Sequence, residues 1–146
     1  MSEFVTKDNG NRAQLEGGMV RDTEEGKTRW DLIPDQVFFF YYSSNATQKI
    51  IEAYQTRDWI TFISELIRIE CSRNAMDFWK RQAELMERGA KKYGEHNWML
   101  GKGEDAHARY VKSLNRHFKQ WLIGDREEDH AVACVFNING ILYTEE

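Results

Sequence analysis

Apolar residues recur every three or four positions along most of this chain, which is the period of an amphipathic helix. The pattern breaks near 56–58 and again at glycines, so it divides the chain into several helices. Pro34 suits a first helical turn because its φ is preset, although the apolar run after it would also fit a buried strand. Helices are therefore predicted over 37–42, 46–55, 59–69, 74–88, 106–123 and 125–143.

Glycines and charged stretches mark the expected loops. Gly89 and Gly124 lie where glycine commonly ends a helix, and residues 88–105 are punctuated by glycine as loops are. Residues 1–24 have no sustained period, which predicts an irregular segment with order beginning near Gly17. The expected fold is all-α, a compact domain of about five or six helices with long glycine-punctuated loops.

The length and composition of the chain narrow the class of protein. Its 146 residues suffice for one domain, so we expect a flexible start over 1–16 and a single helical domain over 17–146. The net charge of −4 argues against binding a nucleic-acid duplex, which favours a basic excess. Both cysteines lie in apolar helical runs, and neither a signal sequence nor a membrane span is present. These features predict a cytoplasmic protein with no membrane partner.

The segment 116–137 carries the strongest chemical signal. Asp125, Glu127, Glu128, Asp129 and His130 fall within six positions, and a divalent cation would relieve the repulsion among the carboxylates. Mg²⁺ is the natural candidate, with Mn²⁺ as a substitute. Helical spacing places Glu127 and His130 on one face, so the predicted metal ligands are Glu127, Asp129 and His130. The alternative is that the acids decorate a helix N-terminus and that His130 is a satisfied core residue.

Two further polar residues belong to the same segment. Asn137 lies two turns beyond His130 on a helix that is otherwise apolar on every side, so its amide needs a partner. Antiparallel packing of the last two helices would bring His117 near Glu128 or Asp129, where it could orient a water or bind phosphate. A histidine at the margin of an apolar face is otherwise a surface residue. The catalytic candidates are His117, Glu128 and Asp129.

Two basic stretches contain groups that bind anions. Residues 17–34 combine glycines with Arg21, Lys27 and Arg29 and could wrap an anion, although they lack the pattern of a phosphate-binding Walker loop. The alternative is a capped loop in which Arg29 pairs with Asp31. Residues 91–98 combine two lysines, two aromatic rings and an amide, which suits a nucleotide. The alternative there is that the rings pin a long loop to the core.

Four motifs in order, GGMVRD, GKTRWDLIP, RGAKKYGEHNW and RHFKQWLIGDREEDHAVACVFN, resemble the phage and bacterial dATP/dGTP diphosphohydrolase N-terminal domain family. The motifs cover roughly 17–34 and 88–142. The resemblance implies an all-α pyrophosphohydrolase that uses Mg²⁺ to cleave a deoxynucleoside triphosphate. The last helix also loosely resembles MazG-like pyrophosphohydrolases, whose EExxE helix is lacking here. Relative to the family, residues 37–82 are expected to be an insert.

The resemblance assigns roles to most of these residues. A purine deoxynucleoside triphosphate would be cleaved to monophosphate and pyrophosphate, in a bacterial host's cytoplasm if the gene is phage-borne. An alternative is a phage protein that sequesters a nucleotide or nucleotide-derived signal, and a second is a helical interaction protein. The aromatic run after Pro34 suggests a homo-oligomer under each of these. The expected substrate-binding residues are Arg21, Lys27, Arg29, Lys91, Lys92, Tyr93, His96, Asn97, Trp98, Arg116 and Asn137.

Overall fold

The computed structural model describes residues 4, 8, 10–71 and 74–145 and is mostly helical. Short 3₁₀ turns at 16–18, 30–32 and 97–100 join some of the elements. The all-α prediction is confirmed. Within the described residues the six α-helices are α1 (Asp35–Tyr42), α2 (Gln48–Thr56), α3 (Trp59–Glu70), α4 (Ala75–Tyr93), α5 (Gly103–Ile123) and α6 (His130–Thr144).

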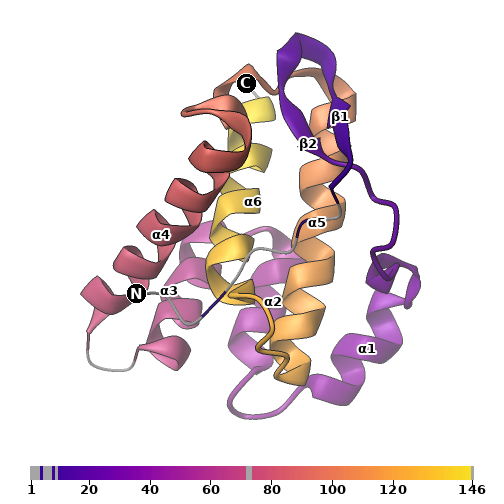
Figure 1. The fold of residues 1–146 in the computed structure, drawn as a ribbon. Helices are drawn as coiled ribbons and strands as arrows, with labels where there is room; N and C mark the ends of the chain where they lie inside the picture. The colour runs from indigo at the N-terminus through magenta and orange to yellow at the C-terminus, as the bar shows by residue number, and fades with distance from the viewer. Residues whose placement is uncertain (1–3, 5–7, 9, 72–73, 146) are drawn as a thin grey trace.

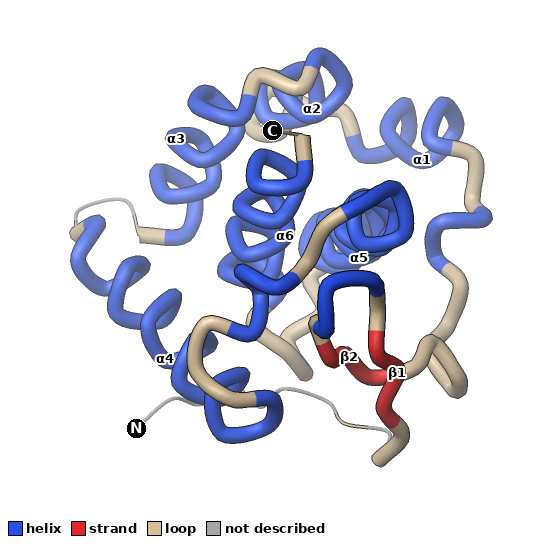
Figure 2. The backbone as a smooth tube through the Cα atoms, turned by 90° about the horizontal axis from the view of Figure 1, so that it is seen from above, coloured by secondary structure: helices blue, strands red, loops and turns tan. Residues whose placement is uncertain are grey.

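The antiparallel pair α5 and α6 forms the centre of the molecule (Figure 1). Helix α4 packs along α6, α3 contacts both α4 and α6, and α2 packs on α3 (Figure 2). Helix α6 is buried on nearly every side, as its apolar sequence predicts. At Gly140 a Cβ atom would lie 2.3 Å from the ring of Tyr110, so glycine is what allows α5 to approach α6 this closely. The helix pair is therefore held in one fixed register.

Helix α5 begins at Gly103 instead of the predicted Ala106, and it also differs from its prediction in which side chains it buries. It ends at Gly124, whose φ of 96° is the left-handed cap that glycine supplies readily, as predicted. Tyr110 and His117, however, are buried between helices instead of lying at the edge of the apolar stripe. Lys119 is also fully buried, where its ammonium donates to the carbonyls of Trp30 and Ile33 and ties that turn to α5.

Two predicted helix ends are wrong. Helix α4 does not stop at Gly89 but continues to Tyr93 and is capped by Gly94, because Gly89 keeps a helical φ and the two lysines that follow suit a helix C-terminus. Helix α6 begins at His130 instead of Asp125, with Asp129 as its N-cap. The preceding acids therefore lie in the α5–α6 loop, and Glu127 does not share a helical face with His130.

The N-terminal segment also differs from the prediction. Residues 1–24 are not irregular throughout, because β1 (Arg12–Gln14) and β2 (Val20–Asp22) pair as an antiparallel hairpin. Order therefore begins before Gly17. Strands of three residues are too short for alternation to be visible in the sequence. The hairpin lies over α5 at one end of the helix pair (Figure 1).

Helix α1 confirms the predicted helix after Pro34. It buries Phe38 and Phe39, while Phe40 is 84 % exposed and Tyr41 is 77 % exposed. An apolar face of this kind suits an interface, and the predicted homo-oligomer stays a prediction. Cys71 and Cys134 are free thiols. None of the described helices combines the length and apolar character needed to cross a membrane.

Candidate functional site

A cavity of about 280 Å³ lies between the N-terminal segment and helices α4, α5 and α6. Its wall is built from residues 19–22 and 26–30, the C-terminal half of α4, the turn after it, and the facing sides of α5 and α6. The volume is near the lower end of pockets that bind small molecules. Segments far apart in the sequence therefore converge on one site.

Three half-buried cations face this cavity. Burial lowers the pKa of Arg21, Arg116 and Lys27, and for Lys27, which also feels the other two charges, the pKa is about 8. The Arg21 guanidinium lies 5.3 Å from the ring centre of Tyr110, and its Nη1 has no hydrogen-bond partner among the described residues. Cations that are partly removed from water and form no ion pair within the described residues are costly, so the cavity is electrostatically suited to a multiply charged anion.

Buried polar atoms without partners also line the cavity. The side-chain oxygens of Ser113, Gln120 and Asn137 have no hydrogen-bond partner within the described chain. Asn137 donates its amide to the carbonyl of Ala133 at 2.8 Å, which leaves its Oδ1 as an acceptor. Because buried polar groups are normally satisfied, these oxygens indicate a ligand or water with hydrogen-bond donors.

Two buried histidines connect the cavity with the α5–α6 loop. His117 lines the cavity, and its Nε2 accepts from the guanidinium of Arg116 at 3.2 Å. Its Nδ1 lies 2.8 Å from Nδ1 of His130, whose Nε2 lies 2.5 Å from a carboxylate oxygen of Asp125. Burial, together with the nearby cations, lowers the pKa of His117 well below its usual value. His117 is therefore neutral at neutral pH.

Of the three predicted metal ligands, only His130 belongs to the group of described side chains whose ligand atoms lie close enough to share an ion. Potential ligand atoms of His117, Glu128 and His130 do lie within 4.8 Å of one another. The ring centres of the two histidines are 5.1 Å apart, which is about as far as a 2.8 Å contact between their nitrogens allows. The two nitrogens therefore point at each other, as in a hydrogen bond, and not toward a shared ion. Glu127 does not line the cavity.

Asp129 is also committed to other contacts. Both of its carboxylate oxygens accept from Arg81 of α4, at 2.8 and 2.7 Å, and one of them caps α6 at the amide of Val132. Arg81 binds Glu70 of α3 at 2.8 Å as well. Although Asp129 touches the cavity wall, these contacts assign it to joining α3, α4 and α6. Its predicted role as catalytic residue and metal ligand is not supported by this geometry.

Replacing Asp129 by asparagine is expected to lower the free energy of unfolding by about 2 kcal/mol, because the buried ion pair with Arg81 is lost while a capping oxygen remains. Urea denaturation measures this change. As a control, Glu145→Gln removes an exposed pair with Arg57 and should change stability by less than about 0.5 kcal/mol. An Asp129→Asn protein of unchanged stability would contradict the structural role.

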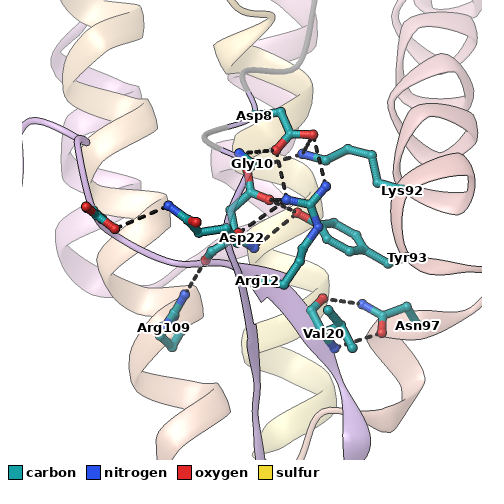
Figure 3. A network of polar contacts seen from close by, with 11 residues as sticks. Asp8, Gly10, Arg12, Val20, Asp22, Lys92, Tyr93, Asn97 and Arg109 are labelled. Atoms are coloured by element: carbon teal, nitrogen blue, oxygen red, sulfur yellow. Dashed lines mark hydrogen bonds and ion pairs between the residues drawn. The ribbon is translucent and has the colours of Figure 1, made fainter.

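The hairpin is held to α4 by a network around Asp22 (Figure 3). The carboxylate of Asp22 accepts from Arg12 at 2.8 Å, Tyr93 at 2.7 Å and Lys92 at 3.2 Å. Asn97 bonds the amide and the carbonyl of Val20 like a neighbouring strand. The predicted loop residues therefore anchor the hairpin over the cavity, and their polar groups are already engaged.

The structure brings most of the predicted site residues together. Four lie outside the cavity wall. Arg29 pairs with Asp31 on the surface, as the alternative reading proposed, Lys91 is exposed, Glu127 lies in the loop, and His130 stands behind His117. The predicted residues on the wall are Arg21, Lys27, Lys92, Tyr93, His96, Asn97, Trp98, Arg116, His117, Glu128, Asp129 and Asn137.

Sequence reasoning missed several residues that position the site. No sequence pattern marks Asp22 or Arg81, and none predicts that Asp125 pairs with His130. Asp22 and Arg81 contact residues 48 or more positions away in the sequence. Asp125 was expected in the first turn of the last helix and instead lies in the loop before it. A partial signal existed, because Arg81 lies in the helix predicted over 74–88 and Asp22 lies inside the GGMVRD motif.

Comparison with known proteins identifies a family. Residues 65–146 match the protein family described as dATP/dGTP diphosphohydrolase, N-terminal, and this is more than half of the chain. No curated protein and no solved structure matches the chain. The matched residues contain α4, α5 and α6, whereas the hairpin and the following loop precede them. The match begins within the segment 37–82 that was expected to be an insert.

Proposed function

The chain belongs to the dATP/dGTP diphosphohydrolase N-terminal family, and from this membership we propose that it hydrolyses a purine deoxynucleoside triphosphate to the monophosphate and pyrophosphate. The observation that carries the proposal is the set of three cavity cations, Arg21, Lys27 and Arg116, none of which forms an ion pair among the described residues. A triphosphate supplies the missing negative charge. The same cations would stabilise the charge that develops on the phosphates during cleavage.

The base and sugar would occupy the rest of the cavity. Trp98 and Phe136 offer aromatic surface on its wall, and Asn137 and Ser113 offer unpaired oxygens. A purine carries ring nitrogens and exocyclic groups that can pair with such atoms. Asn97, which was predicted to bind substrate, has no part in this placement because its amide is already bonded to Val20.

Metal chemistry is not assigned to the residues predicted for it. Asp129 is paired with Arg81, both ring nitrogens of His130 are hydrogen-bonded, and Glu127 lies off the cavity wall. Mg²⁺ prefers several oxygen ligands, and this set does not supply them. We propose that Mg²⁺ or Mn²⁺ takes part as an ion carried by the triphosphate.

His117 is the proposed general base. Its imidazole is neutral, lies on the cavity wall and carries a lone pair on Nε2, which Arg116 now occupies. When Arg116 turns to a phosphate, a water can take its place at Nε2. The imidazole would then accept a proton from that water as it attacks the phosphorus.

The direct test is an activity assay. Purified protein is incubated with dATP, dGTP, dCTP or dTTP, each with Mg²⁺ or Mn²⁺, and pyrophosphate release is measured. Release from the purine nucleotides supports the proposal. If none is cleaved in either metal while one binds tightly, hydrolysis is refuted and nucleotide sequestration is supported. Nucleotide sequestration is the second candidate function, because the three predicted metal ligands do not lie around one point. The cation cluster, by contrast, requires no metal to bind a nucleotide.

Nucleotide affinity is expected to fall as the pH rises from 7 to 9. Lys27 has a pKa of about 8, because it is buried and faces Arg116 and Arg21 more strongly than Asp22 and Glu128, so it loses its charge in this range. Titration calorimetry with a non-hydrolysable dGTP analogue should give a Kd that rises several-fold.

The stability of the free protein should rise over the same pH range, whereas its nucleotide affinity falls. The lowered pKa means that the unfolded chain binds the proton more tightly, so stability rises as the pH passes 8. A Lys27→Met variant should lose both trends. A Kd that climbs equally in this variant would show that another group titrates.

A further inference from the structure

The hydrogen bonds of His117 and His130 form a chain in which the donor and the acceptor of each bond are fixed. Arg116 can only donate, so Nε2 of His117 is an acceptor. A neutral imidazole then carries its hydrogen on Nδ1, which donates to Nδ1 of His130. His130 must in turn carry its hydrogen on Nε2 and donate it to Asp125. The guanidinium at one end and the carboxylate at the other therefore fix both tautomers.

The chain reaches from the cavity to the surface. His117 and His130 are buried, whereas the side chain of Asp125 is 30 % exposed and lies in the loop that joins α5 to α6. Close packing of these two helices holds the rings against each other. The loop carboxylate therefore orients a ring that it does not touch.

We propose that His130 and Asp125 are positioning residues that hold His117 as its Nδ1–H tautomer, with the Nε2 lone pair facing the cavity. They would act through His117 and would not contact the nucleotide. This orientation is what a base at that wall requires, since the other tautomer would present an N–H to the water. The use of the lone pair in catalysis rests on the proposed function, whereas the tautomer itself does not.

In the proposed reaction, water attacks the α-phosphorus and pyrophosphate is the leaving group. The water oxygen bonds to the α-phosphorus while one water proton moves to Nε2 of His117. The bond from that phosphorus to the bridging oxygen breaks, and pyrophosphate leaves with the electron pair. The imidazolium donates through Nδ1 to His130, which Asp125 stabilises in turn, and Nε2 later returns its proton to solvent.

The test is the tautomer of His117, read from imidazole ¹⁵N shifts in the full chain. The chain has four histidines, and the His117 signals are those that disappear in His117→Gln. The wild type should show the Nδ1–H form. In an Arg116→Met background, where no guanidinium donates to Nε2, Asp125→Leu removes the terminal acceptor and should reduce the Nδ1–H population of His117, while Asp125→Glu should restore it. Asp105→Leu removes an exposed acid on α5 and should leave the tautomer unchanged.

Kinetics provide the second measurement. Asp125→Leu should lower kcat by at least about tenfold and leave nucleotide Kd unchanged, because the base is misoriented and the cations are intact. If Asp125→Leu folds poorly, His130→Leu, which removes the acceptor of the His117 Nδ1–H, gives a second variant with the same expected shift in tautomer. An Nε2–H form in the wild type, or a tautomer and kcat that are insensitive to Asp125, would overturn the proposal. If the wild type cleaves no nucleotide, the proposed function fails, and the shifts still decide the tautomer.

Discussion

Replacing His117 by glutamine is expected to lower kcat for nucleotide hydrolysis by about 10²–10⁴-fold, the range that a positioned general base contributes. Glutamine can still accept a hydrogen bond from Arg116 but cannot hold a water proton at neutral pH. The Kd for a non-hydrolysable purine nucleotide should change little, since the three cavity cations remain. Single-turnover kinetics and titration calorimetry separate these two quantities.

The matched control for this variant is His107→Gln. His107 also lies on α5 and makes a side-chain hydrogen bond, to Thr144 at 2.9 Å, but it does not line the cavity. Its replacement should leave kcat and Kd unchanged. If His117→Gln retains the wild-type kcat, His117 is not the base, and the Arg116–His117 contact only fills the cavity wall.

Replacing Arg21 by methionine should raise the nucleotide Kd by about 10–100-fold, the worth of one or two charge-assisted hydrogen bonds to phosphate. The same change should not destabilise the free protein, because it removes a half-buried cation that has no ion-pair partner among the described residues and keeps an apolar stem against Tyr110. We expect a rise of about 1 kcal/mol in the free energy of unfolding.

Opposite signs in affinity and stability distinguish this prediction from general damage. Arg29→Met serves as the control, because Arg29 is exposed, pairs with Asp31 and lies outside the main cavity. It should alter neither quantity measurably. A loss of stability in Arg21→Met that matches its loss of affinity would mean that the guanidinium supports the fold, and the anion site would lose its main support.

The fold was predictable where one helix face alone decides burial. The spacing of Leu114 and Phe118 on α5 and the break at Gly124 follow from local periodicity and glycine chemistry, and the structure has them as expected. The end of α4 was not predictable in this way, since Gly89 is compatible with a helix that tertiary contacts extend. The acids of 125–129 look like a first helical turn, but Asp129 caps the helix and pairs with Arg81 instead.

The candidate site was predictable in its residue types more than in its contacts. Antiparallel packing of the last two helices places His117 near Glu128, as the sequence suggested, and also beside His130, which the sequence did not predict. The stretch 17–34 does place Arg21 and Lys27 on the cavity wall. Which polar groups are already engaged depends on partners 70 or more residues away, such as Asp22 with Tyr93, and no local pattern reveals them.

The hydrogen-bond network around Asp22, a clamp that ties the hairpin to α4, affects how a ligand would leave the cavity. Arg21 and Lys27 belong to the N-terminal segment, whereas Arg116 belongs to the helix pair, so like charges repel each other across the seam between them. The contacts of Asp22 with Lys92 and Tyr93 oppose that repulsion. A bound polyanion would replace this repulsion by attraction, because all three cations would then pair with the same ligand. The ligand would thus link the N-terminal segment to the helix pair. Release of the product would then be coupled to detachment of the hairpin, and the strength of the clamp would set the residence time of the ligand.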